Sequence, residues 1–304
     1  MKNHPNLVLM GQDIAEYGGA FKITEGFVEK FGKKRVRNTP LCEAAIVGSG
    51  LGLSINGYKS MVEMQFADFV TEGFNQIINN LAKTHYRWNQ NADVVVRMPT
   101  GAGTGAGPFH SQSNEAWFTK TPGLKIAYPA FPDDAKGLLI QSFEDPNPVL
   151  FFEHKKLYRS LKGNVPEGFY TTPFGKARKV KEGNELTIIT YGLGVHIALE
   201  FAEKNPEISL EIVDLRTLIP LDTETIYESV KKCNKVIILH EDTLTCGFGA
   251  ELSALISEHC FEDLDAPILR VASMDTPIPF NKKLEDQFMP NEELAEAVDK
   301  ILKY

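Results

Sequence analysis

The sequence predicts an α/β protein with two doubly wound domains, because buried strand patterns alternate with helical patterns along the chain. Helical spacing of apolar residues occurs at 195–204, 223–232 and 249–259, and Asp222 precedes the second segment as a candidate N-cap. Repeated strand–helix–strand units form parallel sheets with helices on both faces. Six apolar runs rich in β-branched residues are typical of buried parallel strands, namely 94–96, 148–152, 186–190, 210–213, 236–239 and 268–271.

Chain length and a local change in composition divide the chain. The 304 residues correspond to about two domains. Glycine, proline and threonine are dense over residues 161–175, where no apolar period is sustained. We therefore expect one domain at 1–160, a linker at 161–175 and a second domain at 176–304.

Composition excludes several classes of function. The formal net charge is −8 and the basic residues are spread out, which argues against nucleic acid or an anionic membrane as the main partner. The four cysteines form no CxxC pair and no metal-ligand spacing. The N-terminal apolar run is too short for a signal peptide or a membrane span, and no transit segment is visible. We expect a cytoplasmic protein, or a mitochondrial-matrix one in a eukaryote.

Three segments carry residues suited to chemistry. Asn38-Thr-Pro-Leu-Cys-Glu43 precedes a glycine-spaced helix pattern at 46–52, and a carboxylate there is most simply a helix-start residue favoured by the dipole. The aromatic segment 63–69 follows a strand, and such a segment is most simply part of a core. Residues 100–113 are rich in glycine and most simply form a surface loop, because they lack the Gly-Lys-Ser/Thr ending of a phosphate-binding loop.

Together these segments resemble the beta subunit of the thiamine-diphosphate-dependent decarboxylating component of 2-oxo acid dehydrogenase complexes. The resemblance covers essentially the whole chain and implies a transketolase-like pyrimidine-binding domain followed by a transketolase C-terminal-like domain. Residues 38–43, 64–68 and 152–159 look more like the branched-chain (2-oxoisovalerate) type than the pyruvate type. Family members usually carry a helix before the first strand, at 7–10 here, so we expect a truncated chain or one half of a fused polypeptide.

The resemblance implies a role for Glu43 in cofactor activation. The matching glutamate hydrogen-bonds the aminopyrimidine of thiamine diphosphate and favours the tautomer whose nitrogen removes the thiazolium proton. Such a carboxyl must be buried. Gln65 would lie at the pyrimidine end, Phe69 would pack on the ring and Leu41 would complete an apolar wall. Phe69 replaces a family tyrosine, so it keeps the stacking face but has no hydroxyl.

The resemblance places His110 in the active site as well. The sequence His110-Ser-Gln-Ser113 matches the family loop whose histidine faces the thiazolium and the incoming lipoyl group. His110 would then act as an acid or base during acyl transfer. The glycines before it let the backbone pass close to substrate and partner.

A potassium ion is a further implication of the resemblance. The Asp-Pro-Asn sequence at 145–147 is first of all a turn signature. In the branched-chain family, mainly backbone carbonyls around this turn and on the neighbouring strand hold potassium, and oxygen ligands suit a hard cation. The matching positions are Ala92, Val94, Val95, Ser142, Asp145 and Asn147.

The partners follow from what the chain lacks. It contains no Gly-Asp dipeptide, although Gly-Asp-Gly begins the usual magnesium and diphosphate motif of thiamine enzymes. An alpha subunit would supply those ligands in an alpha2beta2 heterotetramer. The second domain would form subunit contacts and dock a dihydrolipoyl acyltransferase core with its lipoyl domain, and His240 and Glu241 are expected to be structural. The alternatives are a pyruvate or acetoin dehydrogenase beta subunit, and a non-catalytic module that docks the alpha subunit to the core.

Overall fold

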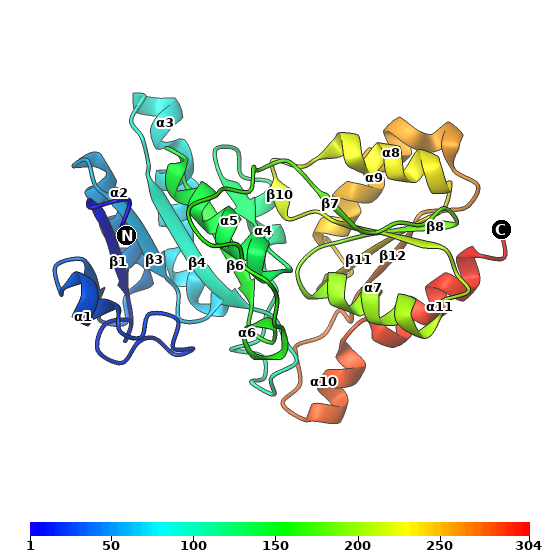
Figure 1. The fold of residues 1–304 in the computed structure, drawn as a ribbon, viewed down its shortest axis with the longest axis horizontal. Helices are drawn as coiled ribbons and strands as arrows, with labels where there is room; N and C mark the ends of the chain where they lie inside the picture. The colour runs from blue at the N-terminus through cyan, green and yellow to red at the C-terminus, as the bar shows by residue number, and fades with distance from the viewer.

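The computed structural model describes residues 1–304 and contains two sheets side by side, each covered by helices on both faces (Figure 1). This arrangement confirms the predicted fold class. All six predicted strands are present, and each pairs in parallel with at least one neighbour. The predicted helices are present too, and the Asp222 side chain caps the second of them by accepting a hydrogen bond from the backbone N–H of Thr225.

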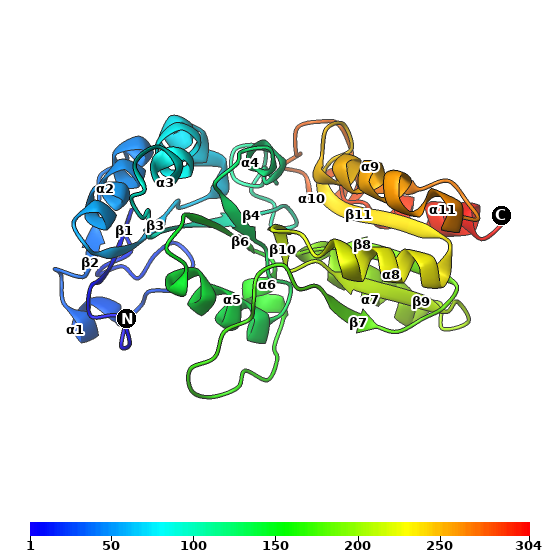
Figure 2. The ribbon, with the colours of Figure 1, turned by 90° about the horizontal axis from the view of Figure 1, so that it is seen from above.

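The first sheet has seven strands in the order β10-β5-β6-β4-β3-β1-β2, and all neighbours except β10 and β5 are parallel. Its helices lie in two layers, with α2 and α3 on one side of the sheet and α1 and α5 on the other (Figure 2). The strands are β1 (Leu7–Gly11), β2 (Val36–Asn38), β3 (Lys59–Glu63), β4 (Val94–Thr100), β5 (Lys125–Ala127), β6 (Val149–His154) and β10 (Thr217–Ile219). The helices are α1 (Phe27–Phe31), α2 (Glu43–Ile55), the 3₁₀ helix η1 (Ala67–Gly73), the π-helix η2 (Gln76–Leu81), α3 (Ala82–Trp88), α4 (Ala116–Thr119), α5 (Pro132–Glu144) and α6 (Leu157–Ser160).

The second sheet has five strands in the order β12-β11-β8-β9-β7, and only β7 is antiparallel. Figure 1 shows α8 and α9 on one face of this sheet and α7 and α11 on the other. The strands are β7 (Arg178–Lys181), β8 (Leu186–Thr190), β9 (Leu210–Asp214), β11 (Val236–Thr243) and β12 (Leu269–Ser273). The helices are α7 (Leu193–Lys204), α8 (Thr223–Cys233), α9 (Phe248–Cys260), the 3₁₀ helix η3 (Phe261–Asp263), α10 (Lys282–Phe288) and α11 (Asn291–Ile301). None of the helices combines the length and apolar composition that a membrane crossing requires.

Helix α2 packs closely on the first sheet because Gly50 leaves room. A Cβ atom on Gly50 would lie only 3.0–3.2 Å from side-chain atoms of Val62, Ser60 and Val94, which is tighter than ordinary interior packing allows. Gly50 therefore sets how near the middle of α2 comes to the sheet.

The two halves of the chain share a core. One cluster of 33 buried hydrophobic residues runs from the α2 side of the first sheet to α8 and α9 in the second half. In addition, β10 comes after the predicted linker in sequence but pairs with β5 at the edge of the first sheet. Pairing covers an edge that would otherwise expose unpaired backbone groups. The relative placement of the two sheets is therefore fixed by apolar burial and by a shared strand.

Candidate active site

The candidate site lies at the carboxyl-terminal edge of the first sheet. Gln12 follows β1, Gln65 follows β3, and the glycine loop (residues 101–112) follows β4. Ligand sites in open parallel sheets lie at this edge, because loops from several strands converge there. Sheet topology thus brings together residues that are far apart in sequence.

Glu43 is the first residue of α2 and is only 8% exposed. The Gln12 side-chain amide donates a hydrogen bond of 3.0 Å from Nε2 to Oε1 of Glu43. The Gln12 Oε1 atom is itself buried without a partner. The site therefore offers a fixed carboxylate and, beside it, an unused acceptor, both of which suit a polar heterocycle with N–H groups.

Two phenylalanines surround His110. The ring of His110 meets Phe66 edge to face with centroids 4.7 Å apart, and meets Phe69 with centroids 5.4 Å apart. Phe66 and Phe69 also contact each other at 5.8 Å. The helix that begins beside them, η1, reaches the start of α2, where a Cβ on Gly73 would lie 3.5 Å from the Glu43 backbone oxygen. The aromatic cluster and the carboxylate thus belong to one contiguous region.

Asp68 holds the half of the glycine loop that follows His110. Its Oδ1 atom accepts hydrogen bonds from the backbone N–H of Ser111 (3.2 Å) and of Gln112 (3.1 Å), and from the Gln112 side chain (3.0 Å). Thr100 Oγ1 donates to the Gln112 carbonyl at 2.8 Å, which closes the base of the loop. Because Asp68 belongs to the same helix as Phe69, the backbone next to His110 is fixed relative to the aromatic rings.

Lys155 follows β6 and is buried against the same loop. Its Nζ atom donates to the Gly101 carbonyl at 2.5 Å and lies 5.9 Å from the centre of the Phe66 ring. Burial lowers the pKa of this ammonium to about 8, because desolvation disfavours the charged form. A cation of reduced basicity therefore stands close to His110 and the aromatic cluster.

The second half of the chain supplies a buried polar layer behind the loop. Glu241 Oε1 accepts from the Ala102 backbone N–H at 2.5 Å, and its Oε2 lies 2.5 Å from His154 Nε2. Tyr191 donates to Glu115 at 2.8 Å. Burial raises the pKa of Glu115 to about 8 and that of Asp242 to about 7, and the Asp242 charge adds to the shift of Glu115. Glu241 and Asp242, together with Ser113 and Trp117 among others, line a cavity of about 290 Å³.

His240 lies on β11 and packs against the start of α9. It is fully buried, its Nδ1 lies 3.1 Å from the Asp242 backbone oxygen, and desolvation lowers its pKa to about 4. A Cβ on Gly247 or Gly249 would come within 2.6 Å of its ring, so the ring fills the space that these two glycines leave.

The apolar side of the site is open to the surface. Leu41 is 77% exposed although it lies two residues before the buried Glu43. Gln65 and Phe69 are half-buried. A buried carboxylate, two aromatic rings and an exposed leucine fit the pyrimidine end of thiamine diphosphate. No group of three or more His, Cys, Asp and Glu side chains is arranged to hold a metal ion.

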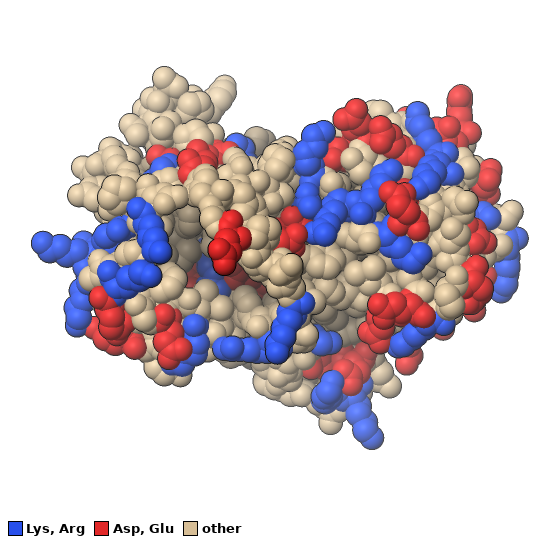
Figure 3. Space-filling view, in the orientation of Figure 1, with Lys and Arg blue, Asp and Glu red and all other residues tan.

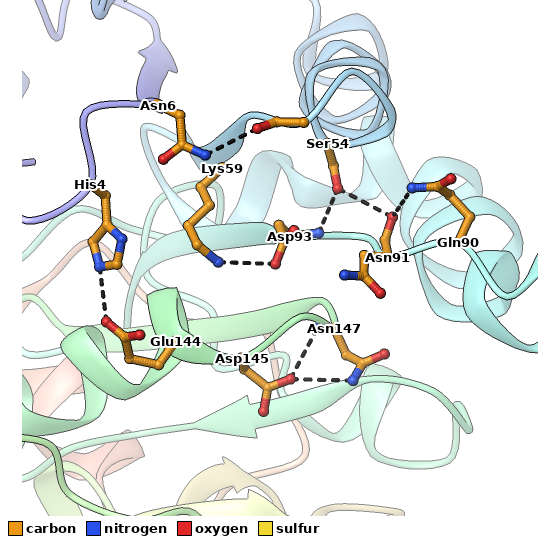
Figure 4. A network of polar contacts seen from close by, with 11 residues as sticks. His4, Asn6, Ser54, Lys59, Gln90, Asn91, Asp93, Glu144, Asp145 and Asn147 are labelled. Atoms are coloured by element: carbon orange, nitrogen blue, oxygen red, sulfur yellow. Dashed lines mark hydrogen bonds and ion pairs between the residues drawn. The ribbon is translucent and has the colours of Figure 1, made fainter.

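The segments expected to hold potassium also lie together. The Ala92 backbone N–H donates to the Pro146 carbonyl at 3.1 Å, and both Asn147 N (3.0 Å) and Asn147 Nδ2 (3.3 Å) donate to Asp145 Oδ1. Figure 4 shows this turn near Asp93, the residue that precedes β4. Lys125 donates to the other Asp145 oxygen. The two carboxylate oxygens of Asp145 thus accept from three N–H donors, one of them the Lys125 ammonium, and potassium binding stays a prediction.

Several residues of the site were not singled out from the sequence. Asp68 and Lys155 lie inside the motifs at 64–68 and 152–159, so an acidic or basic residue beside an aromatic could have pointed to them. Gln12, which donates to Glu43, and Glu285, which accepts from the backbone N–H groups of Gly103 and Gly105 in the glycine loop, have no recognisable motif around them. Each reaches its partner only because the fold brings together residues 31 or more positions apart.

Two family models match the chain. The model of the transketolase pyrimidine-binding domain matches residues 1–160, and that of the transketolase C-terminal domain matches residues 175–294. A solved structure titled "Split gene transketolase, inactive beta4 tetramer" superimposes with a TM-score of 0.78 at 22% identity, covering 99% of this chain and 93% of that one. This likeness concerns the fold alone.

Relatives match along nearly the whole chain. The 2-oxoisovalerate dehydrogenase subunit beta of Bacillus subtilis is 47% identical over 302 residues, covering 98% of this chain and 92% of that protein. The protein of the same name in Pseudomonas aeruginosa is 42% identical, covering 92% and 85%. The pyruvate dehydrogenase E1 component subunit beta of Bacillus subtilis is 40% identical, covering 100% and 95%. As the sequence motifs predicted, the chain belongs to the transketolase-like family of 2-oxo acid dehydrogenase beta subunits that includes the 2-oxoisovalerate enzymes.

Proposed function

We propose that this chain, together with an alpha subunit, decarboxylates a branched-chain 2-oxo acid and transfers the acyl group to lipoyl-lysine. The observation that carries the proposal is the grouping of Glu43, Phe69 and His110 at the carboxyl edge of one sheet. A scaffold that only joined two other proteins would have no use for a buried carboxylate next to an aromatic and histidine cluster.

The residues suit this chemistry. Thiamine diphosphate, when bound, supplies the carbon nucleophile and accepts the electron pair released with carbon dioxide. Glu43 would hold a proton at a ring nitrogen. The hydrogen bond from Gln12 Nε2 keeps the Glu43 carboxyl in position for that role. Phe69 would cover a ring face. His110 would move a proton at the sulfur of the incoming lipoyl group, because His110 is only half-buried and its neighbour Phe109 is 68% exposed.

An alpha subunit is the partner that the open site requires in this proposal. Besides Leu41, the large apolar side chains of Tyr86 and Trp88 on α3 are 95% and 60% exposed. Figure 3 shows an almost uncharged surface at the upper left, where Figure 1 places α3. Exposed apolar surface of this kind marks protein interfaces. The alpha subunit would also bring the ligands for magnesium and the diphosphate, in an alpha2beta2 assembly bound to an acyltransferase core.

The branched-chain substrate is favoured over pyruvate. Identity is 47% to the Bacillus subtilis 2-oxoisovalerate protein and 40% to the pyruvate protein of the same organism. The second candidate function is therefore a pyruvate or acetoin version of the same half-reaction. Part of the substrate pocket would come from the alpha subunit, so only an assay of the pair decides between them.

The test is 2-oxo acid decarboxylation followed with a dye acceptor. The chain alone is compared with the chain co-expressed with its alpha-type subunit, and 3-methyl-2-oxobutanoate and pyruvate are offered in parallel. We expect activity only in the pair, with preference for the branched acid. Turnover by the chain alone would contradict the half-site proposal, and an assembled, cofactor-loaded pair without turnover would favour the scaffold function.

A further inference from the structure

A buried carboxylate from the second domain binds the glycine loop. Glu285 on α10 is fully buried. Its Oε1 atom accepts hydrogen bonds from the backbone N–H groups of Gly103 (2.9 Å) and Gly105 (3.1 Å), and its Oε2 accepts from Gly105 (3.0 Å). The partners lie 180 or more positions apart in sequence. A residue at the far end of the chain therefore holds the loop that leads to His110.

The geometry is that of an anion held by converging backbone amides. Gly103 and Gly105 have φ angles of +85° and +69°, a conformation that favours glycine and turns neighbouring N–H groups toward one point. A charged acceptor makes such bonds roughly twice as strong as a neutral one. Glu285 forms no ion pair with a lysine or arginine, so the loop amides are its hydrogen-bonding partners.

Other contacts from the second domain also hold this half of the loop, in addition to the Lys155 bond to the Gly101 carbonyl from the first domain. Glu241 accepts from the Ala102 backbone N–H, and a Cβ on Gly107 would lie 2.2 Å from the ring of Phe280. The half of the loop after His110 is held by Asp68. His110 therefore lies between two held segments, and only the segment before it depends on the second domain.

We propose that Glu285 is a positioning residue that sets the glycine loop and through it the place of His110. Glu285 itself touches neither His110 nor the aromatic cluster. The consequence for turnover rests on the function proposed above, whereas the consequence for loop mobility does not. A measurement of loop mobility therefore tests Glu285 as the loop anchor, and a separate measurement of turnover tests the proposed function.

The first measurement is hydrogen exchange of backbone amides in residues 101–112 of the full chain. In Glu285→Gln, one carboxylate oxygen becomes an amide nitrogen that faces N–H groups and cannot accept from them. We expect exchange at Gly103 and Gly105 to accelerate by about tenfold, the factor for losing a charge-assisted hydrogen bond. The control is Asp286→Asn on the same helix, whose carboxylate pairs only with exposed Lys282 at 2.7 Å and which should leave the loop unchanged.

The second measurement is activity of the assembled complex with thiamine diphosphate. Because His110 is proposed to act in acyl transfer, Glu285→Gln should slow acylation of a lipoyl domain more than dye-linked decarboxylation, while Asp286→Asn changes neither. Glu285→Asp keeps the charge on a shorter arm and should restore part of both readouts; it also serves if the glutamine variant does not fold. Unchanged loop exchange in both variants overturns the proposal. Faster exchange in a complex whose parent protein is inactive would support Glu285 as the loop anchor and reject the proposed function.

Discussion

Replacing Glu43 by glutamine separates the catalytic role of this side chain from its structural role. Glutamine has nearly the same volume and keeps an oxygen that can accept the hydrogen bond from Gln12 Nε2, now 3.0 Å long. It cannot hold or release a proton as a carboxyl does. The variant therefore leaves the local packing in place and removes only the acid–base chemistry and the charge.

The structure sets the expected size of both effects. Making the single acceptor neutral costs about 1 kcal/mol, and losing an acidic side chain at a helix start costs about 0.3–1 kcal/mol. We therefore expect the free energy of unfolding to fall by at most about 2 kcal/mol and the chain to remain folded and assembled. Loss of a positioned acid or base typically lowers the rate by about 10²–10⁴-fold, and turnover should fall within that range.

The assay is dye-linked decarboxylation by the complex with its alpha subunit, together with thermal unfolding and cofactor loading. The matched control is Glu224→Gln, because Glu224 also lies in the first turn of a helix and its side chain is 76% exposed. Both variants lose a helix-start charge, and only one touches the site. If Glu43→Gln turned over as fast as Glu224→Gln at equal cofactor loading, the catalytic role of Glu43 would be refuted.

Three further predictions concern His110, Gly101 and Asp214. His110→Asn should lower acylation of a lipoyl domain by about 10²-fold or more and affect dye-linked decarboxylation less; equal losses in both assays would contradict a role in acyl transfer. Gly101→Ala should lower the free energy of unfolding, measured by denaturant titration, by at least about 2 kcal/mol. The reason is that Gly101 has φ +91° and that a Cβ there would lie 2.0 Å from His154 Nε2. The control Gly105→Ala has open space around the added Cβ and should lower the free energy of unfolding by less. Asp214→Asn tests pH dependence: burial raises the Asp214 pKa to about 7, so folding favours the neutral form and stability is lost as pH rises from about 4 through about 7. The asparagine variant cannot ionise at this position, so its free energy of unfolding relative to that of the parent should rise by up to about 4 kcal/mol between about pH 4 and about pH 7. Urea unfolding at several pH values measures this difference. A difference that stays constant with pH would contradict the raised pKa of Asp214.

Much of the fold follows from local patterns that burial imposes on a sequence. Leu186–Thr190 is a β-branched run that is buried on both faces, and it forms β8 with the same bounds in the middle of a sheet. The strand β10 at Thr217–Ile219 was not expected, because three residues give no measurable period and its partner β5 lies in the other domain. Short edge strands are chosen by the partner available to them rather than by their own residues.

The same division holds for the site. The motif at 38–43 predicted a helix start at Glu43, and Glu43 is the first residue of α2. The roles of Glu43 and His110 in the site came from the family resemblance and stay predictions. The Gln12 amide that fixes Glu43 could not be, because its contact depends on how β1 and α2 meet.

The sequence by itself determined the fold class, the six buried parallel strands, the helices at 195–204, 223–232 and 249–259, and the family, because these depend on patterns and motifs of residues that are neighbours along the chain. Only the tertiary structure decided that Phe66, Phe69 and His110 form one cluster, and that Glu241 and Glu285 from the second domain hold the glycine loop. Such partners are selected when separate sheets pack and buried carboxylates must find N–H donors. The carboxylate and its N–H donors come together only when the chain folds, so their pairing leaves no period or spacing in the sequence.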